Sequence, residues 1–156
     1  MGSLYNIISF IHSWNRWIIV IAGLLLMGMA ISYLSNKRTY NSSLNAVALT
    51  WISSLHIQLI LGIVLYFFLS PLTQAAFNDF GSAMRTTGLR YWAIEHSFIS
   101  FLGIIVAQAG FSISKRKKDN RKRIKTLLIY TIIAFVLILL AIPFGQLGVE
   151  RPWFRV

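Results

Sequence analysis

Four long apolar runs, separated by short polar segments, dominate the pattern of hydrophobic and polar positions along this chain. They cover residues 10–34, 45–70, 90–113 and 125–144. A helix of about 20 mostly apolar residues is long enough to cross a bilayer. The runs are continuous rather than alternating, which argues against the strands of a membrane β-barrel. The pattern therefore predicts a single all-α integral membrane domain over residues 1–156, built as a four-helix transmembrane bundle.

The segments between the runs predict how the helices are connected. The first, "SNKRTYNSS", is short and polar, so the first two helices are expected to be antiparallel neighbours. In the second, "TQAAFNDFGSAMR", apolar side chains recur at helical spacing at Ala76, Phe77, Phe80 and Met84. This spacing predicts a short helix in the membrane interface between the second and third spans. Such a helix would be either a plain connector or a lid over the outer ends of the first and third helices.

The charges of the chain divide unequally between the two sides of the predicted bundle. Only 12% of the residues are charged, whereas a soluble domain has about 25%. Of the 15 Lys and Arg residues, ten fall on the side of the first and third connections, and five on the side of the termini. Short cation-rich loops stay in the cytoplasm. We therefore expect both termini on the periplasmic side of a bacterial inner membrane and "KRKKDNRKRIK" (115–125) in the cytoplasm.

Composition also limits the partners and cofactors that can be expected. The net charge of +11 is explained by this topology signal, so no nucleic-acid partner is expected, while segment 115–125 should contact anionic lipid headgroups. A chain this small, with almost no extramembrane part, is also expected to associate with other membrane protein subunits. The absence of cysteine excludes disulfides, iron–sulfur ligation and c-type haem attachment.

Ionisable groups inside the predicted spans form the short set of candidate binding residues. Such groups are costly in a membrane and usually face the interior of a bundle. His12 and His96 both lie near the N-terminal ends of helices that run inward, so they should lie at similar depth. His56 falls nearer the middle or inner half of the second helix. The candidates are His12, Arg16, His56, Arg90, Glu95 and His96.

Small residues share the helix faces of two of these histidines. On the third helix they follow His96 at Ser100, Gly103, Ala107 and Gly110. On the first helix Gly23 and Ala30 lie on the face of His12 and Arg16. Stripes of this kind allow close approach of either another helix or a flat ligand.

A haem b pocket would use all of these features. The dipole at a helix N-terminus disfavours positive charge, so His12 and His96 are biased toward neutral imidazole, the form that ligates metals. His12, His56 and His96 are the candidate iron ligands, and Arg16 and Arg90 would pair with the propionates. Two other interpretations stay open: a haem-free quinone or His–Glu proton-relay site, and an accessory subunit whose polar groups hold helices together.

Three motifs carry a resemblance to a known family. "IHSWNRW", "HIQLILGIVLYF" and "LRYWAIEHSF" resemble small four-helix bacterial membrane proteins labelled cytochrome b-like, over nearly the whole chain. The family pattern of a His before Arg-Trp, a His on the second helix and an Arg before Glu-His maps to His12, Arg16, Trp17, His56, Arg90, Glu95 and His96. The resemblance implies haem b and respiratory, quinone-linked electron transfer. The chain departs from four-helix di-haem cytochromes, because three histidines allow at most one haem with two histidine ligands.

Overall fold

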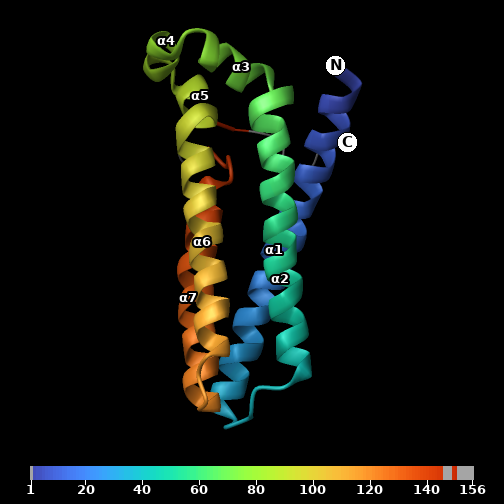
Figure 1. The fold of residues 1–156 in the computed structure, drawn as a ribbon, viewed down its shortest axis with the longest axis vertical. Coiled ribbons are helices and arrows are strands. Elements are labelled where there is room, and N and C mark those ends of the chain that lie inside the picture. Colours follow the sequence, from blue (N-terminus) through green and yellow to red (C-terminus); the bar gives the residue numbers. More distant parts are fainter. Residues whose placement is uncertain (1, 146–148, 151–156) are drawn as a thin grey trace.

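The computed structural model is an all-α bundle (Figure 1) and describes residues 2–145, 149 and 150. Among these residues, four helical segments are long and apolar enough to cross a membrane. The predicted four-helix fold is therefore confirmed. The segments are α1 (Gly2–Ser35); α2 (Ser42–Val64) continued by the π-helix η1 (Leu65–Leu69); α5 (Thr87–Arg90), the π-helix η2 (Tyr91–Glu95) and α6 (His96–Lys115) as one segment; and α7 (Asn120–Ala141).

Local sequence signals set the ends of these helices. Asn41 caps α2 by accepting a hydrogen bond from the Leu44 N–H, and Asp119 caps α7 by accepting one from the Lys122 N–H. Helix α7 ends at Ala141, two residues before Pro143, which has no N–H to continue the helical bonds. Helix α1 begins at Gly2, earlier than the predicted residue 10, because "SLYNIISF" continues the helix ahead of the longest apolar run.

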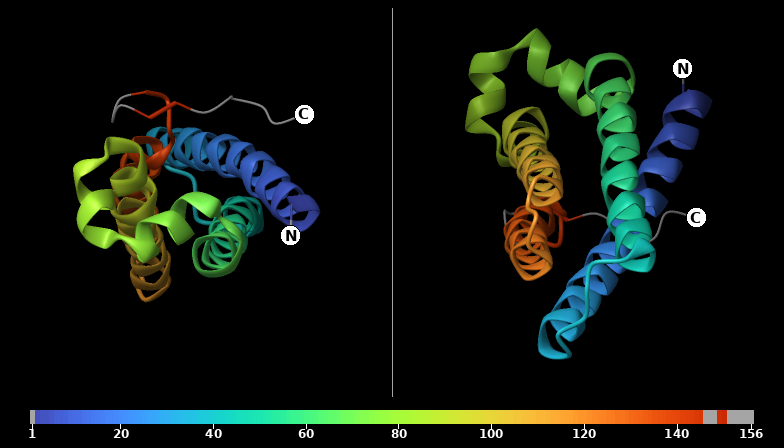
Figure 2. Two further views of the ribbon diagram at one scale, coloured as in Figure 1. Left: turned by 90° about the horizontal axis from the view of Figure 1, so that it is seen from above. Right: turned by 60° about the horizontal axis from the view of Figure 1, so that its bottom comes forward.

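The helices form two antiparallel pairs, α1 with α2 and α6 with α7 (Figure 1). Helix α1 also packs on α7, whereas α2 stands at one edge of the bundle (Figure 2). Helix α1 begins and α7 ends at one end of the bundle, here called the outer end. Connections 36–41 and 116–119 lie at the other, here called the inner end. The names follow the predicted topology, and the sidedness itself stays a prediction.

The inner half of the bundle is closely packed around small residues. A Cβ atom added to Gly110 would collide with the Cβ of Tyr130, and one added to Gly23 would lie 2.7 Å from the ring of Phe135. At Gly103, nearer the middle of the bundle, the nearest atom would be Ile138 Cδ1, at 3.0 Å. The small-residue stripes predicted from the sequence therefore serve helix–helix packing in this half of the molecule. The space that they create is filled by side chains of α7.

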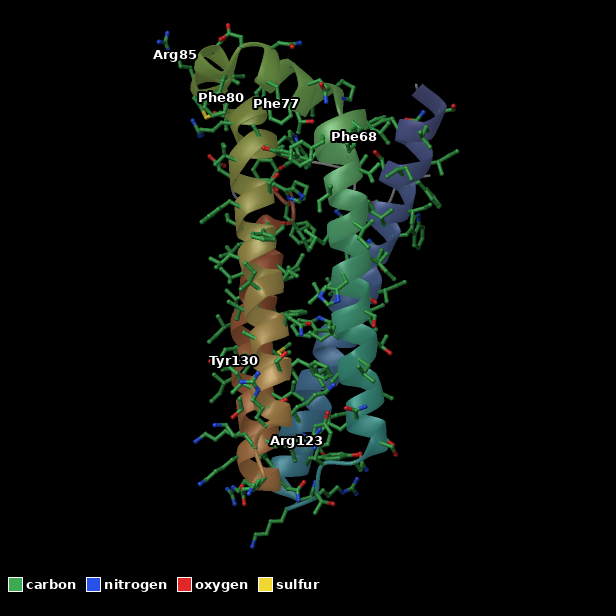
Figure 3. All side chains as sticks on the ribbon, viewed as in Figure 1. Phe68, Phe77, Phe80, Arg85, Arg123 and Tyr130 are labelled. Atoms are coloured by element: carbon green, nitrogen blue, oxygen red, sulfur yellow. The ribbon has the colours of Figure 1, made fainter. Side chains whose placement is uncertain are left out.

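The connection between α2 and α6 contains more than the single short helix predicted. It comprises α3 (Pro71–Asn78) and α4 (Phe80–Arg85), separated at Asp79, which caps α4 by accepting the Ser82 N–H. Ala76 and Ala83 are buried with Ala93 of η2. Phe77, Phe80 and Arg85 lie at the outer end, opposite Arg123 near the inner end (Figure 3).

Side chains of α3 also fasten this connection to η1. The wider turn of a π-helix displaces the backbone from its usual α-helical bonds. Thr73 Oγ1 donates to the Tyr66 carbonyl at 2.7 Å, and Gln74 Nε2 donates to the Phe67 carbonyl at 2.7 Å. Helix α3 thus contacts η1 of the second span and α5 and η2 of the third, whereas the predicted lid would have covered the first and third helices.

Candidate functional site

A cavity of about 570 Å³ lies in the outer half of the bundle, between α1, the α2–η1 segment and the η2–α6 segment. Sites for small molecules and cofactors have volumes of roughly 300–1,000 Å³. Leu72 and Thr73 of α3 line its outer side, and Ile138 and Ala141 of α7 also contribute. Of the six candidate residues, the structure brings three to this cavity: His12, Arg16 and His96.

His12 and His96 face each other across the cavity. Their ring centroids are 6.4 Å apart and the ring planes are inclined at 61°. The similar depth predicted for these two residues is therefore confirmed. Metal–nitrogen bonds to histidine are about 2 Å long, so two nitrogens on one ion lie up to about 4 Å apart and the ring centres lie farther apart. The observed separation is compatible with ligation of one ion by both rings.

The hydrogen bond of His96 determines which of its nitrogens is available. Its Nδ1 lies 2.8 Å from the carbonyl oxygen of Ala141. A carbonyl can only accept, so Nδ1 must carry the proton, and in the neutral ring Nε2 then carries the lone pair. The Tyr91 hydroxyl donates to the same oxygen at 2.7 Å. Because the last carbonyls of a helix have no intrahelical partner, the end of α7 supplies an acceptor that holds the His96 ring.

A network of uncharged polar side chains fixes the turn of α1 that carries His12. Gln58 Nε2 donates to the backbone carbonyl of His12 at 3.0 Å. Asn15 Nδ2 is placed between the Ser54 carbonyl at 2.9 Å and Gln58 Oε1 at 2.8 Å. The ring of His12 reaches toward α2, where a Cβ added to Gly62 would lie 3.6 Å from His12 Cε1. Asn15 and Gln58 were missed in the sequence, although polar residues inside apolar spans commonly join helices.

Arg16 adds a cationic group to the cavity wall, one turn of α1 below His12. Its Nη2 lies 3.4 Å from the Ser13 hydroxyl oxygen, and its guanidinium lies 5.4 Å from the ring centroid of Trp17. The side chain is half-buried. A guanidinium in this position can form a paired hydrogen bond with a carboxylate, or donate to a carbonyl oxygen.

The other three candidates lie elsewhere. Arg90 Nε forms an ion pair with Glu95 Oε1 at 2.7 Å, and Arg90 Nη1 lies 3.4 Å from the carbonyl of Met84. These two residues therefore tie η2 to α4 and do not line the cavity. His56 is exposed on the face of α2 that points out of the bundle. The three histidines are thus not gathered into a single site.

The two π-helices flank the cavity on opposite walls. The Ser70 N–H bonds to the Leu65 carbonyl and the His96 N–H to the Tyr91 carbonyl, five residues back in each case. The Tyr66 hydroxyl donates to the Ala93 carbonyl at 2.7 Å, which links η1 with η2. Such irregular turns often occur at functional sites. They escape a sequence analysis because it assumes a constant helical period.

The cavity opens sideways between α2 and α6. Five of the large apolar residues that line it are also exposed: Ile63, Phe67, Ile94, Phe98 and Phe101. They belong to the two facing segments, α2–η1 and η2–α6. On a helix that spans a bilayer, an exposed apolar side chain faces lipid. The opening of the cavity is therefore lined on both sides by apolar side chains that would face lipid.

The residues present fit a haem better than a metal ion held by side chains alone. In the part of the chain that the structure describes, no group of three or more His, Cys, Asp or Glu side chains is placed to hold a metal ion. A haem needs only one or two protein ligands, because the porphyrin supplies the others. The facing rings, the bare Nε2 of His96 and the apolar walls meet that need.

Comparisons of the chain with models of protein families, with curated proteins and with solved structures gave no match.

Proposed function

We propose that this chain is a haem b-binding membrane protein that takes part in quinone-linked respiratory electron transfer in a bacterial inner membrane. The observation that carries the proposal is the pair of facing imidazoles, His12 and His96, with ring centroids 6.4 Å apart in an apolar cavity. The sequence motifs that resemble cytochrome b-like membrane proteins support the same assignment. His56 has no part in this site, because its side chain is exposed and does not line the cavity.

Each residue of the site has a defined task in this proposal. His12 and His96 would hold the haem iron, and the Ala141 carbonyl accepts a hydrogen bond from the Nδ1–H of His96. A hydrogen bond of this kind orients a ligating imidazole and raises its basicity. Arg16 would pair with a propionate and neutralise its charge inside the membrane. When bound, the haem supplies one-electron redox chemistry.

An absorption spectrum of the protein purified in detergent tests the proposal directly. After expression with ample haem, the oxidised protein should show a Soret band, and dithionite reduction should give the sharp α-band of a six-coordinate b haem. His12→Ala and His96→Ala should each remove the six-coordinate spectrum. His56→Ala is the matched control and should retain it. A colourless wild-type protein, or loss of the spectrum in the His56 variant alone, would contradict the proposed site.

Arg16 gives a second, independent readout. A charge-assisted hydrogen bond to a propionate contributes roughly 1.5–3 kcal/mol. Arg16→Gln should therefore weaken haem retention or shift the midpoint potential while the protein stays folded. Arg16→Lys should restore only part of the effect, because a point charge does not reproduce a planar fork. An unchanged potential in both variants would leave Arg16 the role of an interfacial anchor.

The sideways opening favours a second candidate, a quinone site without haem. Arg16 and His12 would donate hydrogen bonds to the quinone carbonyls, and the exposed apolar residues at the opening would admit the isoprenoid tail from the membrane. In that case the purified protein would be colourless but would retain quinone through extraction, and Arg16→Gln would release it. A protein that binds neither haem nor quinone would be an accessory subunit of a larger membrane complex.

The proposal includes an orientation in the membrane. We place segment 115–125 in the cytoplasm against anionic lipid headgroups, and the histidine pair toward the periplasm. A reporter active only in the cytoplasm, inserted at Lys118, should give a strong signal, whereas the same reporter fused after Val156 should give none. The reverse result would place the site at the cytoplasmic face.

A further inference from the structure

The outward face of α2 carries an imidazole where a membrane has its hydrocarbon core. His56 lies at the middle of the 28-residue segment Ser42–Leu69, about 20 Å from either end at about 1.5 Å per residue. Its side chain is exposed. Within residues 2–145, 149 and 150 it makes no hydrogen bond or ion pair. Ionisable residues at this depth almost always face protein or water and pair with a polar group.

The residues around His56 form a regular seam along α2. They recur at steps of three and four residues, and every one is exposed. We call this set the α2 seam: Ala46, Leu49, Ser53, His56 and Ile60. The spacing is that of paired helices in a left-handed coiled coil, where such positions face the partner. Ala46 and Ser53 are small enough to let two helix backbones approach closely.

We propose that the α2 seam binds the same seam of a second copy of this chain to form a parallel dimer in the membrane. Two copies inserted in the same direction are related by a two-fold axis along the membrane normal. That axis brings equivalent residues together at equal depth. His56 then contacts His56 of the partner subunit, and neither imidazole remains exposed to lipid.

The chemistry of the seam is self-complementary. A neutral imidazole has one nitrogen that donates and one that accepts, so two of them can form a hydrogen bond with each other. The hydroxyl of Ser53 can likewise donate and accept. The seam contains no charged residue that would require an opposite charge on a different protein. A different partner would have to present its own polar group at the same depth, whereas a second copy does so by symmetry.

The dimer proposal rests on different residues from the proposed haem site. The five residues of the α2 seam do not line the cavity, whereas the next two positions at the same spacing, Ile63 and Phe67, do. Each subunit would therefore retain its own His12–His96 pair, and the two proposals can fail separately.

Cysteine cross-linking in native membranes tests the interface, because the chain has no cysteine of its own. Ser53→Cys is a small change at the centre of the seam. Oxidation should give a disulfide-linked product of twice the mass of the chain, since cross-linking requires Cα atoms within about 7 Å. Ile132→Cys is the matched control, because Ile132 is 42% exposed on the other lipid-facing side of the bundle, near the middle of α7. Equal cross-linking of both variants, or a Ser53→Cys product of a different mass, would overturn the proposal.

Substitution of His56 tests the hydrogen bond itself. His56→Leu should weaken dimerisation in lipid bilayers by roughly three- to twenty-fold, the range measured for single hydrogen bonds between membrane helices. Single-molecule photobleaching of labelled protein over a range of dilutions gives the dissociation constant. His56→Asn keeps a donor and an acceptor and should remain closer to the wild type. A Leu variant that dimerises as tightly as the wild type would overturn the role of His56.

Discussion

The inner and outer halves of this bundle use the same four helices in opposite ways. In the inner half, Gly110 brings α6 into direct contact with α7, and a single added methyl group has no room there. In the outer half, α2 and α6 stand apart around a cavity of about 570 Å³. The helices there are joined by individual hydrogen bonds between side chains and carbonyls rather than by close packing. Close packing is thus found at one end and the cavity at the other.

The difference shows that small residues alone do not make a ligand site. The space beside the glycines that could have admitted a flat ligand is filled by side chains of α7, namely Tyr130, Phe135 and Ile138. The open half instead contains the two π-helices and a cavity lined by polar groups of α1 and α6.

The largest expected effect on stability comes from adding a methyl group at Gly110 in the closely packed inner half. Gly110→Ala places a methyl group against Tyr130 and should lower the free energy of unfolding by about 1–3 kcal/mol through overpacking. Gly62→Ala in the outer half is the matched control, since its new Cβ would lie 3.6 Å from His12 Cε1, an ordinary contact. Thermal unfolding of both variants in the same detergent measures the difference. If the two variants were equally stable, the inner half would not be the tightly packed one.

A smaller loss is expected when the polar link between α1 and α2 is broken. Asn15→Leu removes the hydrogen bonds to Ser54 and Gln58, and each such bond in a membrane contributes on average about 0.6 kcal/mol. A loss of about 1 kcal/mol in unfolding free energy is therefore expected. A double-mutant cycle with Gln58→Leu should give a coupling energy of about 0.6 kcal/mol, because it reports only the bond between Asn15 and Gln58. Additive effects of the two substitutions would show that the pair contributes nothing jointly.

Tyr66→Phe should affect the opening of the cavity more than the whole fold. It removes the hydrogen bond to the Ala93 carbonyl that links η1 with η2, at an expected cost of about 0.6 kcal/mol. Hydrogen exchange should become faster at the amides of η2, while the amides of α6 near Gly110 remain protected. Faster exchange throughout α6 would mean that the two halves unfold as one unit.

The smallest effect is expected at the inner end, as a dependence of stability on pH. Burial raises the pKa of the Tyr40 phenol above its usual value of about 10, and the Arg123 guanidinium, 3.5 Å from the ring centroid, partly opposes this shift. Because the folded pKa is raised, the neutral phenol favours the folded state. That stability is present below about pH 10 and is lost as pH rises through the folded pKa. The melting temperature should fall more steeply above about pH 10 in the wild type than in Tyr40→Phe, and parallel curves would exclude the effect.

The sequence predicted the features that depend on hydropathy and on distance along a helix. Apolar run length identified the four spans, and the positions of His12 and His96 near the starts of parallel helices predicted their common depth. It could not predict the face of α2 that carries His56, because a span that is apolar all round gives no preferred side. It also could not show whether Gly103 and Gly110 would meet a helix or a ligand, since that depends on what lies opposite.

Contacts between distant segments could not be predicted from the sequence either. The pairing of Asn15 with Gln58 joins two helices through a geometry that neither segment encodes alone. The acceptor for His96 is the backbone carbonyl of Ala141. Every residue has a backbone carbonyl, so the residue type at position 141 does not indicate this role. The π-helices shift the register of side chains by breaking the regular period. A sequence with so few charges therefore specifies its spans more clearly than its site.

The early end of α7 also sets the depth of the site in the membrane. The part of α7 that follows the cationic segment 115–125, residues 126–141, is about 24 Å long, shorter than the hydrocarbon thickness of about 30 Å, so Ala141 lies inside the bilayer, toward its outer boundary. The His96 ring, held by that carbonyl, lies at the same level. A redox group there would exchange electrons and protons with one aqueous compartment, while the packed inner half would act as an insulator toward the other.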